Sequence, residues 1–330
     1  MPISEIPLDP AVPVRQRKPL PADGEDGRYY QSWYPVALSN EVAAGAVIGR
    51  PFLGGKVAIF RTRDGEVAVV SAFCPHLGAD LSVGQVVDDT LRCPFHHWRY
   101  NSGGRCVRTG VGDPPPSTAR LFRFPTLERQ GIIWAFNGTE PLFELPRYRN
   151  DTTLVTRTFI SETYACDGWA FACNTSDMQH LKAVHSFEFN HPDPHDLVTW
   201  HKWGFSYPLQ AEHGLGPAID WTVGITGCSV FMQEGLIDGW WLGGFAGNSC
   251  PGDGTHQVYF SFSVEAGPEA EERLAYSYKL LMDTLAQDRD ILNTMHFTPG
   301  TLTKSDKSLA RFIEFLRNLP RAHPAAEFMS

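Results

Sequence analysis

The sequence predicts an α+β protein in which an all-β domain precedes a second domain made of an antiparallel sheet and long helices. Between residues 29 and 137, short runs of β-forming residues alternate with turn residues. Residues 257–264 alternate strictly and place Val258, Phe260, Phe262 and Val264 on one face of a strand. Helical segments follow at about 269–295 and 305–319. At 330 residues, the chain is long enough for about two domains.

Three parts follow in order along the chain. Residues 1–28 are rich in proline and charge, which predicts an extended or mobile arm. Residues 29–145 form the all-β domain, with a hairpin around Asp64-Gly65, a surface loop at 112–117 and a last strand at 131–136. Residues 146–330 form the second domain, entered through a linker at 141–150.

Composition favours a cytoplasmic enzyme. The net charge of −9 and the 20% of charged residues argue against a nucleic-acid partner, which would favour a basic stripe. No apolar run is long enough for a membrane span, and the N-terminus does not resemble a signal peptide. Five of the seven cysteines lack paired spacing and are expected to be reduced, mostly buried thiols.

Two short motifs supply a set of metal ligands. Cys74-Pro-His76 and Cys93-Pro-Phe-His96 offer two thiolates and two imidazoles, separated by sixteen residues that leave room for a short strand and its return. This donor set suits a Rieske [2Fe-2S] cluster, in which two histidines replace two cysteines on one iron. A Cys2His2 zinc site uses the same residue types. The tight CxH spacing and the proline after each cysteine favour the iron-sulfur cluster.

The run CPHLGADLSVGQVV, followed by LRCPFHHWRYNSGGRCVRTG, resembles the Rieske domain of the non-haem iron oxygenases. The resemblance covers roughly residues 29–300 and implies that the second domain is a helix-grip (START-like) catalytic domain. One position departs from the family pattern: the family usually has glycine after the second histidine, and here the residue is His97. His97 is therefore a possible competing ligand, although the CxxH spacing favours His96.

A second constellation lies in the segment from Asn174 to His185. Two imidazoles and a carboxylate that leave open positions are typical of non-haem Fe(II) oxygenases. On one helix, Asn174, Asp177 and His180 would share a face, whereas His180 and His185 would point about 140° apart. We therefore expect the helix to kink, widen or end between the histidines. Resemblance to the family pattern DxxHxxxxH implies that both histidines are iron ligands.

The third ligand is expected on the later helix. Asp288 has Leu281, Leu285, Ile291 and Leu292 as helical neighbours, which places its carboxylate on an apolar, inward face. A metal would remove the cost of burying that carboxylate. Asp290 is the alternative, although its neighbours are polar. The family resembles this chain at Gln287-Asp288-x-x-Ile291, with the aspartate as the ligand.

The resemblance also implies a role for Asp177 and an oligomer. In the family, the matching aspartate bridges a metal-bound histidine to a cluster histidine of the adjacent subunit, here His180 to His76 or His96. An oligomer follows from that role, and the resemblance implies a homotrimer. Asp177 and Asn174 are therefore the candidate catalytic residues beyond the ligands. The competing interpretation of Asp177 is a carboxylate that caps or solvates its helix.

Together these sites predict the terminal component of a Rieske-type non-haem iron monooxygenase, with one [2Fe-2S] cluster, one mononuclear Fe(II) and O2 as co-substrate. No dinucleotide-binding motif is visible in the sequence, so a separate NAD(P)H-dependent reductase is implied, with or without a ferredoxin. The other class of function is a Rieske electron carrier or redox sensor whose second domain has no oxygenase activity.

The motifs look most like the ketosteroid hydroxylase and cholesterol desaturase branch of the family. We therefore expect hydroxylation of a hydrophobic alicyclic or polycyclic compound, including steroid-like ones. The alternative is hydroxylation or demethylation of an aromatic or heterocyclic natural product. A set of large apolar residues is expected to line the pocket or to fill a plain core: Trp221, Phe231, Met232, Trp240, Trp241, Phe245, Phe260 and Phe262.

Overall fold

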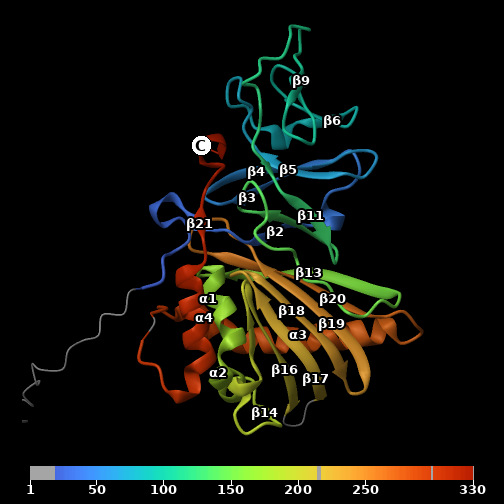
Figure 1. The fold of residues 1–330 in the computed structure, drawn as a ribbon. Coiled ribbons are helices and arrows are strands. Elements are labelled where there is room, and N and C mark those ends of the chain that lie inside the picture. The colour runs from blue at the N-terminus through green and yellow to red at the C-terminus, as the bar shows by residue number, and fades with distance from the viewer. Residues whose placement is uncertain (1–18, 214–216, 299, 330) are drawn as a thin grey trace, which may run out of the picture.

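The computed structural model describes residues 19–213, 217–298 and 300–329. Small β-sheets form the upper half of the molecule, and one large sheet with its helices forms the lower half (Figure 1). The α+β prediction is thus confirmed. Of the arm predicted at 1–28, residues 1–18 lie outside the described residues. The remainder packs on the fold, with Leu20 buried and a short turn of 3-10 helix at Glu25–Gly27.

Among the described residues, three antiparallel sheets lie wholly within the N-terminal half, and a fourth, two-stranded sheet pairs this half with the C-terminal segment. The predicted hairpin is present, because the strands on either side of Asp64-Gly65 pair with each other. The first sheet contains β3 (Val47–Phe52), β4 (Gly55–Arg61), β5 (Val67–Ser71) and β10 (Arg123–Phe124). The second contains β2 (Trp33–Leu38), β11 (Thr126–Arg129) and β12 (Ile132–Phe136). The third contains β6 (Gln85–Val87), β7 (Thr90–Arg92), β8 (Arg99–Tyr100) and β9 (Cys106–Arg108).

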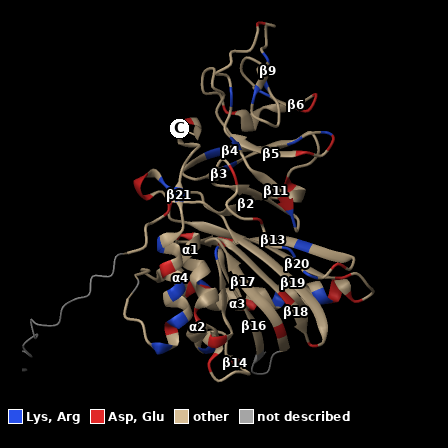
Figure 2. Cartoon of the chain, viewed as in Figure 1, with Lys and Arg blue, Asp and Glu red and all other residues tan. Residues whose placement is uncertain are grey.

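The C-terminal half is organised by an antiparallel sheet of eight strands, counted over the described residues. Its strands are β13 (Leu154–Tyr164), β20 (His256–Glu265), β19 (Trp240–Asn248), β18 (Val230–Ile237), β17 (Ala218–Thr226), β16 (Gly204–His213) and β14 (Phe187–Phe189), with β15 (Thr199–His201) paired to β16. Most charged residues lie on loops and helices, and the long strands are largely uncharged (Figure 2). A sheet that is covered on both faces has few charged residues in its strands, because little of its surface is in contact with water.

Helices cover the large sheet. The two predicted C-terminal helices are present as α3 (Ala270–Thr294) and α4 (Lys307–Asn318). Shorter helices are α1 (Gly168–Ala172), α2 (Met178–Ala183) and α5 (Ala326–Met329), and 3-10 turns lie at Ser39–Glu41, Leu81–Val83, Cys173–Ser176, Pro194–Leu197 and Lys304–Asp306. No helix in the described part of the chain has the length and hydropathy needed to cross a membrane.

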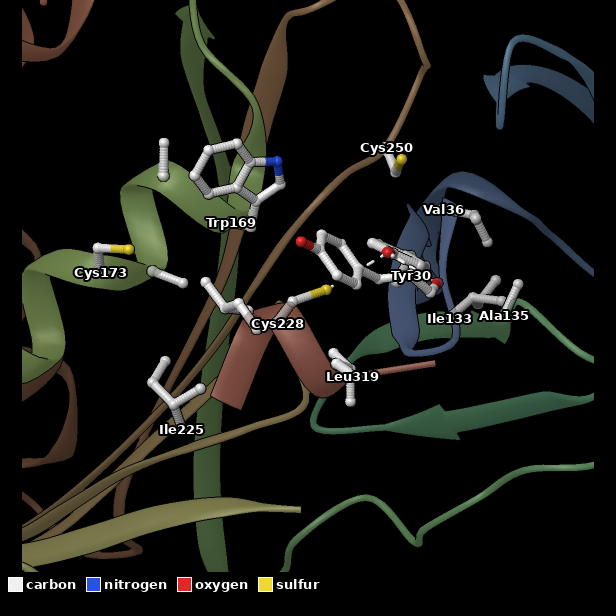
Figure 3. Close-up of a cluster of buried hydrophobic side chains, with 14 of the residues drawn as sticks. Tyr30, Val36, Ile133, Ala135, Trp169, Cys173, Ile225, Cys228, Cys250 and Leu319 are labelled. Carbon is white, nitrogen blue, oxygen red and sulfur yellow. Dashed lines mark hydrogen bonds between the residues drawn. The ribbon is translucent and has the colours of Figure 1, made fainter. Parts of the chain in front are cut away.

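One hydrophobic core joins the two halves. Tyr30, Val36 and Ile133 from the small sheets pack in the same cluster as Trp169 and Cys228 from the lower half (Figure 3). The hydroxyl of Tyr34 also lies 3.4 Å from the Cys228 sulfur. The two halves are therefore held together by buried side chains as well as by the connecting chain.

The C-terminal segment returns to the upper half, where the C label stands in Figure 1. Its strand β21 (Arg321–Ala322) pairs with β1 (Tyr29–Tyr30), and Asn137 donates a hydrogen bond to the Ala322 carbonyl. Further on, the ring of Phe328 packs 5.8 Å from that of Phe122. The last residues thus cover one side of the first half.

Candidate functional site

The two Cys/His motifs lie on loops of the same construction. In each loop the cysteine N–H donates to a carbonyl five residues later, from Cys74 to Ala79 and from Cys93 to Trp98. Four residues after each cysteine the backbone enters the left-handed region, at Gly78 (φ 75°) and at His97 (φ 58°). Glycine adopts this conformation at little cost, which is a physical reason for the glycine that the family resemblance led us to expect at position 97. His97 pays a strain penalty in place of that freedom.

The four donor side chains converge at the tips of these cluster loops (residues 74–79 and 93–98). Both cysteines are buried, whereas the His76 side of the site is open to solvent. The rings of His76 and His96 lie 4.7 Å apart, centroid to centroid, and Trp98 stacks on His76 at 4.5 Å. His97 is exposed and has no such ring contact among the described residues.

This donor set fits a Rieske cluster. The two cysteines are buried and the two histidines are more exposed, and together they supply the two thiolates and two imidazoles that such a cluster binds. The Tyr100 hydroxyl lies 3.0 Å from the Cys74 sulfur, and a hydrogen bond to a ligand sulfur is one of the means by which a protein tunes a cluster's potential. Tyr100 lies outside both Cys/His motifs, and its burial and its contact with Cys74 are seen only in the structure.

The second constellation is assembled by the end of helix α2 and the middle of helix α3. Helix α2 ends at Ala183, and Ser186 is left-handed (φ 57°), so the chain turns back immediately after His185. The predicted break between the two histidines is confirmed. The Nε2 atoms of His180 and His185 each lie 3.3 Å from Oδ1 of Asp288. All three donor atoms lie within 4.8 Å of one another.

The triad (His180, His185 and Asp288) fits a divalent metal. Asp288 is only 5% exposed, and its Oδ1 has no hydrogen-bond partner although it is buried. A buried carboxylate oxygen left without a partner is costly, and a metal ion between the three donors removes that cost. Burial lowers the pKa of His180, which favours the neutral imidazole, whereas Asp288 and Gln287 raise the pKa of His185 against the effect of burial. Two imidazoles and one carboxylate suit Fe(II) and leave coordination positions open.

Gln287 orients one member of the triad. Its Oε1 lies 2.8 Å from Nδ1 of His185, so Nδ1 carries the proton and Nε2 is left free to bind a metal. In the sequence, Gln287 stands out only as part of the family pattern around Asp288. Its role depends on the side chains of two distant segments meeting, which no local periodicity shows.

Asp290 is not at this site. Its side chain is 82% exposed and pairs with Arg289 on the surface. The expectation that Ile291 also faces inward is wrong, because Ile291 is 46% exposed. Leu285 and Leu292 are buried as expected, so the apolar stripe of α3 passes on one side of Ile291.

The helical face proposed for Asn174, Asp177 and His180 is also wrong, because these residues do not share one helix. Asp177 has extended backbone (φ −93°, ψ 92°) between the 3-10 turn at Cys173–Ser176 and α2. Its Oδ1 accepts hydrogen bonds from the N–H groups of Gln179 and His180 at 3.0 Å, which caps α2. Asn174 lines the cavity described below.

A cavity of about 200 Å³ opens beside the triad and is lined mainly by apolar side chains. Five of the eight expected large residues line it: Trp221, Phe231, Phe245, Phe260 and Phe262. The other three lie elsewhere. Met232 packs on the opposite side of β18, Trp240 lies near Arg273, and Trp241 packs edge-on against Tyr148.

Comparison with known proteins identifies the first domain and the overall fold. Residues 32–122 match the model of the Rieske [2Fe-2S] domain. The crystal structure of dicamba monooxygenase bound to dicamba aligns with 88% of this chain and 97% of its own, with a TM-score of 0.71 and 20% sequence identity. The chain contains a Rieske [2Fe-2S] domain, is similar in sequence to oxygenases and shares the fold of dicamba monooxygenase. The cluster loops lie within the matched residues.

Among curated Rieske oxygenases, the cholesterol 7-desaturase nvd of Bombyx mori is 30% identical over 203 residues, which are 56% of this chain and 43% of that protein. The aminopyrrolnitrin oxygenase PrnD of Pseudomonas fluorescens is 29% identical over 238 residues, 67% of this chain and 63% of that protein. This chain spans less than half the length of the cholesterol 7-desaturases that it matches.

Proposed function

We propose that the chain is the terminal component of an oxygenase that hydroxylates a hydrophobic alicyclic or polycyclic compound. The observation that carries the proposal is the triad, whose open side faces an apolar cavity in a chain that also has a Rieske domain. His180, His185 and Asp288 would hold the iron, and Cys74, His76, Cys93 and His96 the cluster. When bound, these groups supply the one-electron chemistry and the open positions that O2 activation requires.

The shape of the cavity supports a long ring substrate. Six residues of α3 form a single stripe along it: Ser277, Leu280, Leu281, Thr284, Leu285 and Asp288. From Ser277 to Asp288 the helix rises about 16 Å at 1.5 Å per residue. The apolar walls exclude water and hold a hydrophobic ring system by contact, while the triad lies at one end. Relatives of this chain include a cholesterol 7-desaturase and a 3-ketosteroid-9-alpha-monooxygenase oxygenase component.

Electrons are proposed to come from a separate NAD(P)H-dependent reductase, with or without a ferredoxin, and to pass between subunits of a homotrimer. The exposed ring of His76 can meet a neighbouring subunit. Asp177 uses Oδ1 for the helix cap, and no described residue donates a hydrogen bond to its other oxygen, Oδ2. Oδ2 is therefore available to bridge to a cluster histidine of the next copy.

Asp177→Asn tests this bridge, because asparagine retains the oxygen that caps α2. We expect normal iron and sulfide content and a turnover reduced by at least about tenfold. Unchanged turnover would leave Asp177 as a cap only, and a monomer in solution would exclude the inter-subunit route.

The oxygenase proposal is tested by metal stoichiometry and turnover together. Anaerobically purified protein is expected to contain three irons and two acid-labile sulfides per chain, and His180→Ala two irons with an unchanged Rieske spectrum. Wild type supplied with a reductase, NADH and O2 is then expected to hydroxylate a polycyclic substrate. Two irons in both proteins after Fe(II) reconstitution would instead identify an electron carrier or redox sensor.

A further inference from the structure

The polar side chains that line the cavity differ in whether they already have partners. Four of them are hydrogen-bonded within the protein: Ser277 to the Arg273 carbonyl, Thr284 to the Leu280 carbonyl, Ser229 to the Asn248 carbonyl, and Asn248 to the Gly168 carbonyl. The carboxamide of Gln233 has no hydrogen bond to any residue that the structure describes. The carboxamide of Asn174, just before the triad's helix α2, is also unpaired, and two buried atoms of other lining residues have no partner among the described residues, Nε1 of Trp221 and Oδ1 of Asn248.

The sheet provides a place for the Gln233 side chain. Gln233 on β18 stands opposite Val223 on β17 and Gly244 on β19. A Cβ atom at Gly244 would lie 2.8 Å from Cγ and 3.1 Å from Cδ and Nε2 of Gln233. The glutamine side chain therefore lies across the space that a larger residue at position 244 would fill.

The backbone does not explain the glycine at position 244. Gly244 is not in the left-handed region, so any residue could adopt its conformation. A glycine inside a strand weakens the strand and often marks a close approach of another group. Here that group is the Gln233 side chain on the cavity wall.

Gln233 lies a short distance from the triad. Phe231, two residues earlier on β18, packs against the cluster that contains Leu285 and Leu292. Those leucines flank Asp288 on α3. Two residues of strand correspond to about 7 Å, so the carboxamide lies one row of side chains further along the cavity from the triad.

We propose that Gln233 determines specificity by hydrogen-bonding a carbonyl or hydroxyl oxygen on an otherwise apolar ring substrate. A carboxamide both donates and accepts, so it can pair with either group. One such bond in a largely apolar cavity helps to fix which carbon faces the triad, because most of the remaining contacts are apolar and non-directional. The inference rests on the proposed oxygenase function for its consequence, but its binding part can be tested without turnover.

The test uses equilibrium dialysis of the oxidised holoprotein, without reductase, against androstane and its two monoketones, with the oxygen on the A ring or the D ring. Wild type is expected to bind one of the ketones at least tenfold more tightly than the hydrocarbon. Methionine has a volume similar to that of glutamine and no hydrogen-bonding amide. Gln233→Met is therefore expected to weaken the binding of that ketone by about tenfold to a hundredfold. Hydrocarbon binding is expected to stay within about threefold.

Val223→Ala is the matched control, because Val223 lines the same cavity next to Gln233 in the sheet. This substitution removes apolar contact and changes no polar group. The binding of the ketone and the binding of the hydrocarbon are therefore expected to weaken by the same factor. Gly244→Ala is a second test that retains the carboxamide but displaces it, and a partial loss of discrimination is expected. Equal discrimination in wild type and Gln233→Met, or binding of neither ketone by wild type, would overturn the assignment.

Turnover separates this inference from the oxygenase proposal. With reductase, NADH and O2, wild type is expected to give one product from the preferred ketone, and Gln233→Met a mixture of positions. A single unchanged product from the variant would reject the role of Gln233 and leave the oxygenase proposal standing. Lost discrimination in dialysis with no product from wild type would retain the binding site and reject the oxygenase.

Discussion

The cluster loops and the triad both rely on histidine with an anionic partner, yet they differ in exposure and in the origin of their residues. The cluster donors come from two hairpin loops about twenty residues apart, and His76 is open to solvent. The triad joins α2 to α3 across about a hundred residues and is buried. An exposed edge suits exchange of electrons with another protein, whereas a buried site protects a reactive centre from water.

The comparison also shows which site depends on which part of the fold. The loops are held by their own backbone hydrogen bonds and by Trp98. The triad depends on the docking of two helices against the large sheet. We therefore expect that a substitution can abolish either site and leave the other intact.

The largest effect is expected from Asp288→Ala. Removing the one carboxylate leaves two imidazoles, which cannot hold iron firmly, so turnover is expected to fall by roughly a hundredfold or more. The visible spectrum of the cluster is expected to be unchanged. Asp290→Ala serves as the control and is expected to retain full iron content. Loss of the cluster spectrum in Asp288→Ala would show that the two sites are coupled through folding.

His76→Ala is expected to remove the cluster and to leave the triad intact. It removes a donor at the exposed edge, so the Rieske absorption and both sulfides are expected to disappear, and turnover with them. About one iron per chain is expected to remain at the triad after Fe(II) reconstitution. His97→Gly is the control, and we expect it to retain the cluster and raise the melting temperature slightly, since it relieves a left-handed histidine. A cluster lost in His97→Gly would assign His97 as the ligand.

Gln287→Leu is expected to have an intermediate effect. Without the acceptor at Nδ1, His185 loses its fixed tautomer, and affinity for Fe(II) or Co(II) is expected to fall by about tenfold to a hundredfold. Gln287→Glu retains an acceptor and is expected to restore most of the affinity. Metal titration of apo-triad protein measures both. Equal affinities in all three proteins would contradict an orienting role.

The smallest effect concerns the junction between the two halves. Asp23 lies beside Asp167 and Cys250, and burial, followed by the Asp167 charge, raises its pKa to about 7. A carboxyl group whose pKa is higher in the folded chain favours folding at low pH, and this contribution is lost as pH rises from about 3.8 through about 7.

Asp23→Asn is therefore expected to stabilise the protein at pH 8 more than at pH 5. The difference is expected to be about 5 to 10 °C in melting temperature, because two pH units of unequal proton binding correspond to roughly 2.7 kcal/mol, and about 1 kcal/mol shifts the melting temperature by about 2 to 4 °C in a domain of roughly 150 to 250 residues. Glu25→Gln, a nearby exposed change, is the control. A gain of the same size at both pH values would point to packing and not to the charge.

The sequence predicted features that depend on local spacing. The cluster motif, the hairpin at Asp64-Gly65 and helix α3 follow from patterns within about twenty residues. Asp288 could be chosen over Asp290 because helical periodicity distinguishes a buried face from an exposed one. Periodicity did not place Ile291 correctly, since a residue three positions away can lie at the edge of the stripe.

Features that depend on contact between distant segments could not be predicted. The Asp177 carboxylate caps helix α2, so the chain is not helical at Asp177 itself. The spacing of three residues between Asn174, Asp177 and His180 had suggested one continuous helix. The contacts of Gln287 with His185 and of Gln233 with the space above Gly244 require the packed sheet and helices. Met232 was misplaced because neighbouring residues on a strand face opposite sides, and the sequence did not show which side of β18 holds the cavity.

The return of the C-terminal segment has a consequence for recombining such proteins. Strand β21 supplies hydrogen bonds to β1, and Phe328 covers Phe122, so the structural partners of the first half include residues near position 325. A chimera that takes residues 29–145 alone from this chain would leave both surfaces uncovered. A graft has to include residues 320–329 as well, and a permuted chain that joins this segment directly to Tyr29 would transfer the cluster half as one continuous piece.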